Sequence, residues 1–413
     1  MKKVLIICDL FPPAFGPRMG YLCKYLKGLG WQPVVLTEAI KDNTFTFLAN
    51  ECKVHYIQFY PQTNRILSKL IWFIIQILDN YFHYKDLRII YKANKLLTQE
   101  SFDVILCSTY RTFPLRATQK VAAQHKLPWI ADLRDIIEQY TGTEFISHSL
   151  PHLWGLDKLI CNRFKRKNLQ IRNQAIQSAQ AITTVSPWHV RILQTYNANT
   201  HLIYNGFDPE IFYSEDIKTK QFIITYTGRL LSTAMRDPSL LFEGLAKLHK
   251  QKLINPESCR VHWYVDNTSK EIIQAEAKRM KVEIFMDYKG YIAAEKIPAV
   301  LNRSSILLLL TNKASQKGPK GVMTTKFFES LAVKKPILCI RSDESVLEKA
   351  LQDSKAGLAA RNQEEVCLFL LTYLKEWEKK GYTTSSIHPD VLQNYSRKEQ
   401  AKQFVSIFEQ IIK

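Results

Sequence analysis

The chain has 413 residues, more than one hydrophobic core usually holds, so its length favours two domains. Its hydrophobic content of 46% and charged content of 23% are typical of a folded, soluble protein and exclude long disordered stretches. The net charge of +19 predicts attraction to an anionic partner, such as nucleic acid, acidic lipid or a phosphorylated small molecule.

The N-terminal sequence and the cysteines point to a cytoplasmic protein. Asp9 and Pro12 interrupt the basic and apolar start, so we interpret it as a first strand and not as a signal peptide. The longest apolar run, Leu70 to Leu78, is about half of the ~20 residues that a membrane-spanning helix needs. The eight cysteines occur singly, without metal-binding spacing, which indicates buried thiols in a reducing compartment.

Short β-branched apolar runs alternate with longer amphipathic segments from end to end. This pattern is typical of parallel sheets crossed by helices, and it predicts an α/β protein with two consecutive doubly wound, Rossmann-like units. The expected strands of the first unit are 3–8, 33–37, 53–59, 102–108, 129–133, 181–186 and 201–205. Those of the second unit are 222–228, 260–266, 283–290, 305–311 and 335–340.

The domain boundaries follow from composition. A turn-rich, polar segment at 207–220 is interpreted as a linker between a first domain at 1–206 and a second domain at 221–394. The remaining segment, 395–413, has the apolar spacing of an amphipathic helix.

The loop after the first strand of the second domain suits a diphosphate. Gly228 and Arg229 follow that strand directly, and Arg236 precedes a helix. Glycine lets a ligand approach the backbone, guanidinium groups match phosphate oxygens, and a helix N-terminus favours negative charge. The alternative is two surface arginines beside a turn.

A second loop and helix, GVMTTKFFESLA, begins at Gly321. Thr324 and Thr325 are candidate caps, and the apolar spacing leaves Lys326 and Glu329 off the buried face. A carboxylate there can accept two hydrogen bonds from a ribose diol. The alternative is a surface Lys–Glu pair that stabilises the helix by roughly a few tenths of a kcal/mol.

In the first domain, charged residues follow the strand 129–133. Asp132, Arg134 and Asp135 are candidate catalytic groups, because charged side chains at the carboxyl end of a strand can take part in acid–base chemistry. The alternative, stronger for Asp132, is a buried Asp–Arg pair that holds the loop. His189, behind the expected helix cap Ser186, is interpreted as a packing residue.

Gly16 and Gly20 are not a dinucleotide-binding fingerprint, because the acidic partner of that motif is missing. Gly16 with Pro17 can simply shape the turn into a helix.

The ordered series of segments resembles the GT4 group of retaining glycosyltransferases, which have the GT-B fold. In the second half these segments are YTGRL, RDPSLLFEGL, KGYIAAEKIPAVLNRSSILLLL and TTKFFESLAVKKPIL. In the first half they are FPPAFGPRMGYLCKYLKGLGWQPVVLT, WIADLRD, AITTVS and LIYNGFDPEIF. The resemblance covers nearly the whole chain. It implies two Rossmann-like domains that face a central cleft, and a C-terminal helix that packs back on the first domain.

The resemblance also implies roles for the candidate residues of the second domain. Arg229 and Arg236 would hold the diphosphate of a nucleotide-sugar donor, Lys326 would lie near it, and Glu329 would bind the ribose. One departure concerns Gly321, which stands where the family often has a first glutamate near the transferred sugar. Backbone amides of 320–325, including those of Thr324 and Thr325, are a possible replacement.

For the first domain, the resemblance implies that Gly16 and Arg18 contact phosphate or acceptor. Asp132, Arg134 and Asp135 would orient the acceptor hydroxyl or stabilise positive charge at the sugar carbon. It implies a retaining reaction without a protein nucleophile, in which the leaving diphosphate helps to deprotonate the acceptor. No metal is expected, because the arginines neutralise the leaving group.

The segment 65–92 carries apolar residues at helical spacing, flanked by basic residues. Core packing is the main interpretation. The second is that this segment lies on an anionic membrane, at the inner face of the cell membrane, and brings the enzyme to a lipid-linked acceptor.

The leading hypothesis is a nucleotide-sugar-dependent glycosyltransferase that acts on a glycan or lipid-linked acceptor in polysaccharide or surface glycan biosynthesis. One alternative is a nucleotide-sugar epimerase, or a degenerate donor-binding subunit of the same fold. Another, suggested by the charge, is a nucleic-acid-binding protein, but the sequence contains neither a recognisable module nor aromatic residues interleaved with a basic stripe.

Overall fold

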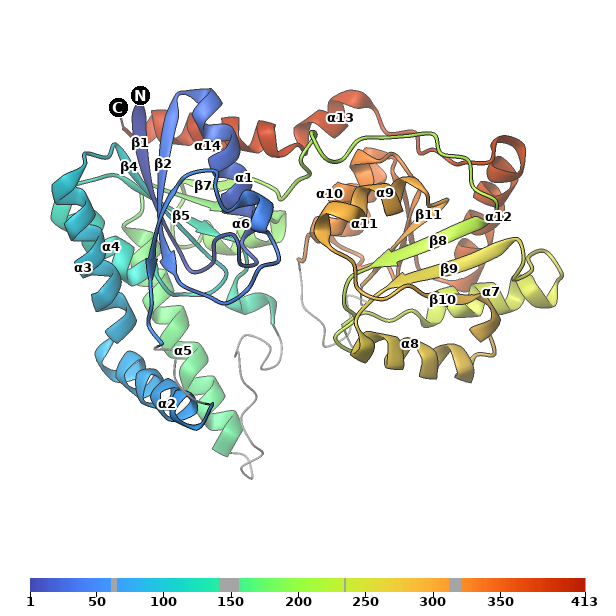
Figure 1. Cartoon of the computed structure of the whole chain (residues 1–413), viewed down its shortest axis with the longest axis horizontal. Helices are drawn as coiled ribbons and strands as arrows, with labels where there is room; N and C mark the ends of the chain where they lie inside the picture. Colours follow the sequence, from blue (N-terminus) through green and yellow to red (C-terminus); the bar gives the residue numbers. More distant parts are fainter. Residues whose placement is uncertain (61–64, 141–155, 234, 312–320, 413) are drawn as a thin grey trace. The chain divides into compact units, whose positions relative to one another are not determined.

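The computed structural model describes residues 1–60, 65–140, 156–233, 235–311 and 321–412. The chain divides into two compact units (Figure 1). Unit 1 comprises residues 1–204 and 400–413, and unit 2 comprises residues 205–399.

Unit 1 contains, within the described ranges, a parallel sheet of seven strands in the order β3-β2-β1-β4-β5-β6-β7. The strands are β1 (Lys2–Cys8), β2 (Trp31–Glu38), β3 (Lys53–Ile57), β4 (Val104–Thr109), β5 (Trp129–Leu133), β6 (Ala181–Thr184) and β7 (Thr200–Leu202). The helices are α1 (Pro17–Leu26), α2 (Arg65–Phe82), α3 (Tyr84–Gln99), α4 (Leu115–His125), α5 (Leu156–Gln177), α6 (Pro187–Leu193) and, from residue 400 on, α14 (Arg397–Ile411).

Unit 2 repeats this plan with six described strands in the order β10-β9-β8-β11-β12-β13, again all parallel. The strands are β8 (Phe222–Thr227), β9 (Cys259–Tyr264), β10 (Met286–Tyr288), β11 (Ile306–Leu310), β12 (Ile337–Ile340) and β13 (Gly357–Ala360). The helices are α7 (Ser239–Lys250), α8 (Asn267–Arg279), α9 (Ile297–Asn302), α10 (Thr325–Ala332), α11 (Val346–Ser354), α12 (Gln363–Lys380) and α13 (Pro389–Asn394).

Each sheet is buried on both faces, as continuous apolar strands require. In β1, Val4 and Ile6 join the core shared with α1 and α14, whereas Leu5 and Ile7 join the core shared with α3 and α4. The two-residue alternation of a strand sends neighbouring side chains to opposite layers. The predicted fold class, two Rossmann-like α/β units, is therefore confirmed.

The C-terminal helix α14 completes the core of unit 1. Phe404 and Phe408 are buried with Val4 and Ile6, and the Phe408 ring lies 5.0 Å from that of Trp31. The last helix of the chain therefore packs on the sheet formed by the first strands.

Three strands differ most from expectation. β7 runs from Thr200 to Leu202, so it shares only two residues with the expected 201–205. β13 was not predicted, because its sequence GLAA lacks the β-branched residues that mark a strand. β10 is shorter than the expected 283–290, since Glu283–Phe285 forms a 3-10 turn.

The expectation of core packing for 65–92 is wrong for most of its apolar side chains. The segment forms two helices that break at His83, which has a left-handed φ of 54°. Only Ile75 of α2 is fully buried among the side chains that the structure describes there, while Leu70, Ile74 and Ile77 are exposed. No helix in the described ranges is both long and apolar enough to cross a membrane.

The cysteines are all free thiols. Seven are buried and Cys52 is half-buried. The interpretation of buried thiols therefore holds for seven of the eight.

Candidate functional site

The two sheets each have a point where the strand order reverses, between β1 and β4 in unit 1 and between β8 and β11 in unit 2. In open parallel sheets, ligands bind beyond the carboxyl ends of the strands at such points. The loops that follow these strands carry most of the polar residues singled out in the sequence.

In unit 2, the end of β8 lies against the start of α10. Gly228 has a φ of +113°, and a Cβ built on it would lie 2.6 Å from Cε of Lys326. Residues almost a hundred positions apart are thus in direct contact. A side chain at 228 would displace the lysine.

The two arginines of the expected diphosphate loop differ in environment. Nη1 of Arg236 donates to the carbonyl oxygen of Arg229, and the hydroxyl of Tyr226 donates to the same oxygen at 3.0 Å. The guanidinium of Arg229 is largely exposed, and its Nε lies 3.2 Å from Oδ2 of Asp266. Arg236 is therefore tied to the loop backbone, whereas Arg229 can turn towards a ligand.

Lys326 is half-buried and has one cationic neighbour, Arg236. Burial and the charge of Arg236 lower the pKa of Lys326 to about 8, although Glu329 acts in the opposite direction. Its Nζ lies 5.8 Å from the ring centroid of Tyr226. Within the described residues Lys326 donates no hydrogen bond and forms no ion pair, so its ammonium group is available to an anion.

Glu329 lies one turn further along α10 and is also half-buried. Burial raises its pKa to about 7, against the opposing charges of Lys326 and Arg397. It accepts no hydrogen bond and forms no ion pair in the part of the chain that the structure describes. The alternative interpretation, a helix-stabilising Lys–Glu pair, is therefore not what the structure shows.

The N-terminus of α10 has no side-chain cap. The helix begins at Thr325, and the hydroxyl of Thr324, at the N-cap position, accepts no hydrogen bond from the first turn. Gly321 has a φ of +66°, which a glutamate would adopt only with strain. Residues 312–320 of this loop lie outside the described residues, and so does Lys320, whose backbone amide was one of the expected contacts.

In unit 1, Asp132 is completely buried and fully bonded. It accepts hydrogen bonds from Arg18, from Ser108 at 2.8 Å and from Thr183 at 2.8 Å. Burial alone would raise its pKa, but Arg18 and the hydroxyl donors hold it below its usual value. The buried Asp–Arg pair, left open by the sequence, is the arrangement found.

Arg18 is the partner in that pair and is only 4% exposed. Its remaining donors reach the carbonyl oxygens of Ile203 and Tyr204 at 3.0 and 2.9 Å. This geometry does not support a contact of Arg18 with phosphate or acceptor. Gly16 likewise shapes the loop, since a Cβ there would lie 2.7 Å from the carbonyl oxygen of Leu10.

Arg134 forms a buried ion pair with Asp9, a residue that the sequence analysis did not select. Asp9 also accepts from the hydroxyl of Thr109 at 2.9 Å and from the backbone N–H of Tyr110 at 3.1 Å. Nε of Arg134 is buried and has no hydrogen-bond partner among the residues that the structure describes. Asp9 directly follows β1 at the switch point, and that position was the signal that could have identified it.

Asp135 begins a chain of polar contacts. Gln139 donates from Nε2 to its carboxylate at 3.2 Å, and Oε1 of Gln139 lies 2.9 Å from Nε2 of His189. Nδ1 of His189 lies 3.1 Å from the hydroxyl of Thr184. Burial raises the pKa of Asp135 to about 6 and lowers that of His189 to about 4. His189 is thus a neutral group within a network, which the packing interpretation missed.

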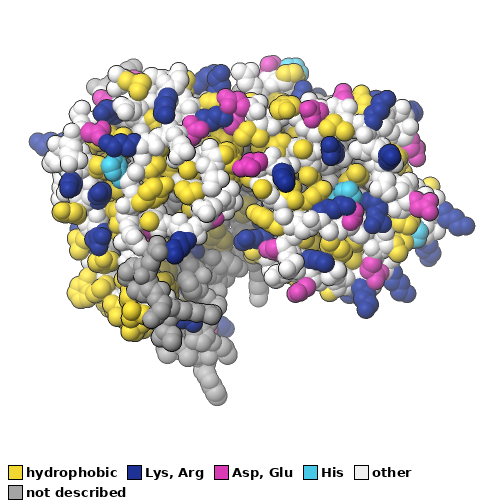
Figure 2. Space-filling view, viewed as in Figure 1, with side chains coloured by type: hydrophobic (Ala, Val, Ile, Leu, Met, Phe, Trp, Pro, Cys, Tyr) yellow, Lys and Arg dark blue, Asp and Glu magenta, His cyan; other side chains and the backbone are white. Residues whose placement is uncertain are grey.

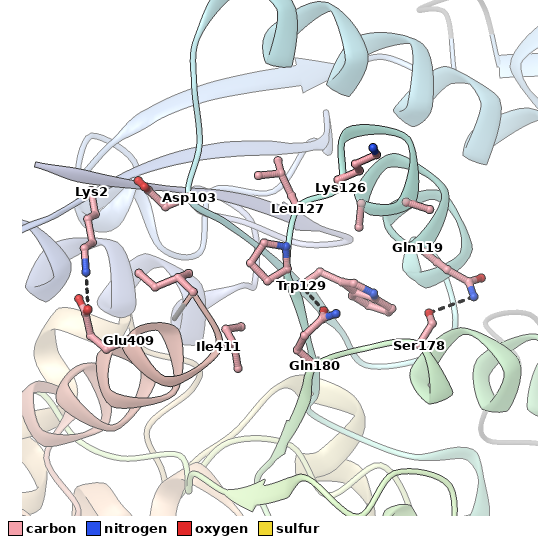
Figure 3. Close-up of a pocket in the computed structure, with 14 residues that line it drawn as sticks. Lys2, Asp103, Gln119, Lys126, Leu127, Trp129, Ser178, Gln180, Glu409 and Ile411 are labelled. Carbon is pink, nitrogen blue, oxygen red and sulfur yellow. Dashed lines mark hydrogen bonds and ion pairs between the residues drawn. The ribbon is translucent and has the colours of Figure 1, made fainter.

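A cavity of about 920 Å³ opens at the opposite, amino-terminal edge of the unit 1 sheet (Figure 3). Several of its polar side chains are already bonded: Lys2 pairs with Glu409, Gln119 donates to Ser178, and Gln180 accepts from the backbone of Trp129. It contains none of the residues discussed above, and we assign it no role.

The structure therefore gathers Gly228, Arg236, Lys326 and Glu329 at one edge of unit 2. In unit 1 it places Arg134 and Asp135 beyond β5, with Asp9 beside them.

Comparison with known proteins agrees with this architecture. The family model described as Glycosyltransferase Family 4 matches residues 18–211. Comparison with curated proteins gave no match.

Several solved structures are similar over essentially the whole chain. The protein HepE of Anabaena, in complex with UDP, has 14% identity and a TM-score of 0.67, covering 99% of this chain and 100% of its own. Sucrose-phosphate synthase of Thermosynechococcus elongatus has 12% identity and a TM-score of 0.63, covering 99% of both chains. UDP-GlcNAc 2-epimerase of Neisseria meningitidis has 12% identity and a TM-score of 0.56, covering 99% of this chain and 100% of its own. At such identities the likeness shows the fold alone.

The family-model match covers most of unit 1, and the solved structures share the fold of the whole chain. The chain therefore has the GT-B fold of two Rossmann-like units and resembles the GT4 family of glycosyltransferases.

Proposed function

We propose that this protein is a glycosyltransferase that moves a sugar from a nucleotide-diphosphate sugar to a glycan or lipid-linked acceptor, in polysaccharide or surface glycan biosynthesis. The observation that carries the proposal is the cluster beyond β8 and β11. There, Lys326 and Glu329 form no hydrogen bond and no ion pair with any described residue, and Gly228 leaves room for the lysine side chain beside the loop. A cation close to a carboxylate is what a diphosphate next to a ribose requires.

The donor contacts divide by chemistry. Arg229 and Lys326 supply positive charge for the diphosphate oxygens, and Arg236 adds to that field while it holds the loop. Glu329 accepts hydrogen bonds from the ribose diol. HepE was solved with UDP and with UDP-glucose, so UDP-sugars are the first donors to test here.

The proposed reaction is the one that the resemblance to retaining glycosyltransferases implies. The bond between the anomeric carbon and the donor phosphate oxygen breaks, and its electron pair stays on the nucleoside diphosphate. The acceptor oxygen forms the new bond on the same face of the sugar, and its hydroxyl proton passes to the leaving phosphate oxygen. The cationic side chains stabilise the diphosphate as its charge develops, so that a metal ion is not required.

On unit 1, Asp135 and Arg134 are the groups that we assign to the acceptor side. Asp135 is half-buried and accepts a hydrogen bond from Gln139, and Nε of Arg134 has no partner within the described ranges. Asp135 would orient the acceptor hydroxyl or stabilise positive charge at the sugar carbon. Asp132 and Arg18 instead hold the frame that positions this loop.

The decisive experiment is a thermal-shift panel of UDP-, GDP-, ADP- and CMP-sugars on the wild type, Arg229→Ala and Glu329→Ala. We expect one nucleotide to stabilise the wild type and to lose most of that effect in both variants. Arg279→Ala is a matched control for Arg229→Ala, because Arg279 is equally exposed and pairs with Glu276. Stabilisation by no nucleotide would contradict the proposal. Equal stabilisation of all variants would refute the site assignment.

A second candidate is an epimerase of the same fold, favoured by Gly321, which supplies no carboxylate near the sugar. An epimerase converts a nucleotide sugar without any acceptor. NMR of the donor incubated with the protein alone distinguishes the two: a new sugar epimer indicates an epimerase, whereas a transferase leaves the donor unchanged or hydrolyses it slowly.

A degenerate donor-binding subunit is the remaining alternative. It would bind the nucleotide through Lys326 and Glu329 but would catalyse neither sugar transfer nor epimerisation. Sugar transfer measured with a range of glycan and lipid-linked acceptors, alongside the binding assay, separates it from the transferase.

A further inference from the structure

The helix α2 exposes an apolar face. Seven of its described large apolar side chains are between 41% and 72% exposed: Leu67, Leu70, Phe73, Ile74, Ile77, Tyr81 and Phe82. Leu70, Ile74, Ile77 and Tyr81 are four, three and four residues apart, so they form one stripe on the helix. Hydrophobic side chains gather at this end of unit 1 (Figure 2). A stripe of this length exposed to water usually marks an interaction surface.

A basic pocket adjoins the end of this stripe. His83, which directly follows α2, lines a cavity of about 340 Å³ together with Arg116 and Lys120 of α4 and Lys167 of α5. The other described lining side chains are amides and one isoleucine, with no carboxylate among them. Arg116 and Lys120 form no hydrogen bond and no ion pair with any residue that the structure describes.

Two carboxylates lie behind the pocket and weaken its charge only in part. Burial and the proximity of Asp79 raise the pKa of Asp86 to about 7, although Arg116 and Lys120 act against this rise. Further cations follow along α5, where Arg163 and Arg166 are exposed beside the exposed apolar residue Ile160. Apolar and cationic groups thus alternate over the surface of this end of unit 1.

We propose that unit 1 docks on an anionic phospholipid bilayer, with the apolar face of α2 inserted at the interface and a headgroup phosphate held by Arg116, Lys120 and Lys167. An amphipathic helix flanked by Lys and Arg lies in the interface plane, where its apolar face enters the acyl boundary and its cations meet anionic lipid. The pocket adds a defined position for one phosphate.

Charge favours a bilayer over a second copy of this chain as the occupant. A self-complementary contact through the α2 face would bring the cations of one pocket close to those of another. The net charge of +19 adds general repulsion between copies. An anionic bilayer covers the apolar face and neutralises the pocket at the same time.

The test is vesicle co-sedimentation of the full chain, with phosphatidylcholine vesicles and with vesicles that also contain phosphatidylglycerol. We expect binding to the anionic vesicles, weakened by added salt, and little binding to phosphatidylcholine alone. The double variant Arg116→Gln/Lys120→Gln removes two cations and should therefore weaken binding to anionic vesicles ~30-fold. Lys250→Gln with Lys278→Gln, an equal charge change on exposed lysines of unit 2, should leave binding within about twofold.

The apolar face is tested separately with Leu70→Gln and Phe73→Gln together. Binding that persists at high salt in the wild type should be lost in this variant, whereas Leu368→Gln, at an exposed leucine of α12, should bind as the wild type does. An unchanged far-UV circular dichroism spectrum and an unchanged midpoint of thermal unfolding show that each variant is folded.

Three results would overturn the proposal. They are equal binding to neutral and anionic vesicles, wild-type binding by both double variants, and a shift from dimer to monomer in the Leu70/Phe73 variant without a change in lipid binding. If the chain binds soluble glycerol phosphate saturably but does not bind vesicles, the pocket is a site for a free phosphate ester instead. This proposal does not depend on sugar transfer.

Discussion

The side chain of Lys326 lies against the backbone of Gly228, where a Cβ would come within 2.6 Å of its Cε. The contact joins the loop after β8 to the first turn of α10, the two segments to which we assign the donor diphosphate. The position of the lysine therefore depends on the absence of a side chain across from it.

Gly228→Ala should weaken nucleotide binding by moving this lysine. The residue would also carry backbone strain on the order of 1–3 kcal/mol, because its φ is +113°. Loss of one charge-assisted hydrogen bond corresponds to about 1.5–3 kcal/mol, so we expect the dissociation constant to rise ~10–100-fold. Isothermal titration calorimetry measures the change.

Gly381→Ala is the matched control for this variant. Gly381 also has a positive φ, +79°, and also lies against a lysine side chain, that of Lys218. It should lose stability to a similar degree but keep its nucleotide affinity. Equal losses of affinity in both variants would contradict the role of Gly228.

Nucleotide affinity should pass through a maximum with pH. Lys326 has a pKa of about 8 in the free protein, so its positive charge, and its attraction for the diphosphate, is lost as the pH rises through that value. Glu329 has a pKa of about 7, so its carboxylate form, the hydrogen-bond acceptor for the ribose, is lost as the pH falls through that value. Titration calorimetry from about pH 6 to 9 should locate the maximum between the two values.

Two variants separate the limbs of this profile. Lys326→Met should remove the alkaline limb, and Glu329→Gln should remove the acid limb. A profile whose shape neither variant alters would mean that other groups control the titration.

Loss of either partner of the Arg18–Asp132 pair should destabilise unit 1. The pair is buried, and removing one partner of such a pair costs about 3–5 kcal/mol because the other charge stays unpaired. Arg18→Met and Asp132→Asn should both lower the midpoint of urea unfolding. Arg279→Met, at an exposed pair, should change the free energy of unfolding by less than about 1 kcal/mol.

Asp135→Asn should separate activity from stability. Its carboxylate accepts one hydrogen bond among the described residues, from Gln139, so asparagine can replace it without loss of fold. We expect nucleotide binding to persist and sugar transfer to fall by about 10²–10⁴. In the wild type, transfer should decline as the pH falls through about 6, where the carboxylate takes up a proton. Wild-type transfer by Asp135→Asn would remove this residue from the acceptor side.

His189 should make unit 1 sensitive to acid. Its pKa is about 4 in the folded chain and 6.5 as the ordinary value, so the unfolded chain binds more protons between these values. Stability is therefore fully present above about pH 6.5 and falls as the pH drops towards 4, by on the order of a few kcal/mol. Urea unfolding at the two ends of this range should show a smaller loss for His189→Gln than for the wild type.

The secondary structure was largely predictable because it depends on local sequence. The β-branched runs such as 129–133 form strands as expected, and Ser186 caps α6 with a hydrogen bond from the backbone of Trp188. The strand β13 escaped prediction because an Ala- and Gly-rich run carries no strand signal of its own. It becomes a strand because β12 offers it a hydrogen-bonding edge.

The proximity of Gly228 and Lys326 was partly accessible from sequence, since parallel strands bring their carboxyl ends to one edge. That rule placed both residues in loops at the same edge of the sheet, although it did not predict the contact between them. The polar network of unit 1 was not accessible. Asp9 and Arg134 are 125 positions apart, and the sequence around either residue does not indicate that the other is its ion-pair partner.

By itself, then, the sequence determined the two Rossmann-like units and the loops in which polar chemistry collects, because apolar periodicity and turn residues act over short distances. Only the tertiary structure decided which charges are buried in pairs, as in Arg18 and Asp132, and which lack partners among the described residues, as in Lys326 and Glu329. It also decided that the apolar stripe of α2 stays exposed. Burial of a helix face depends on which other segments pack against it. The periodicity within one helix does not indicate whether such a segment exists.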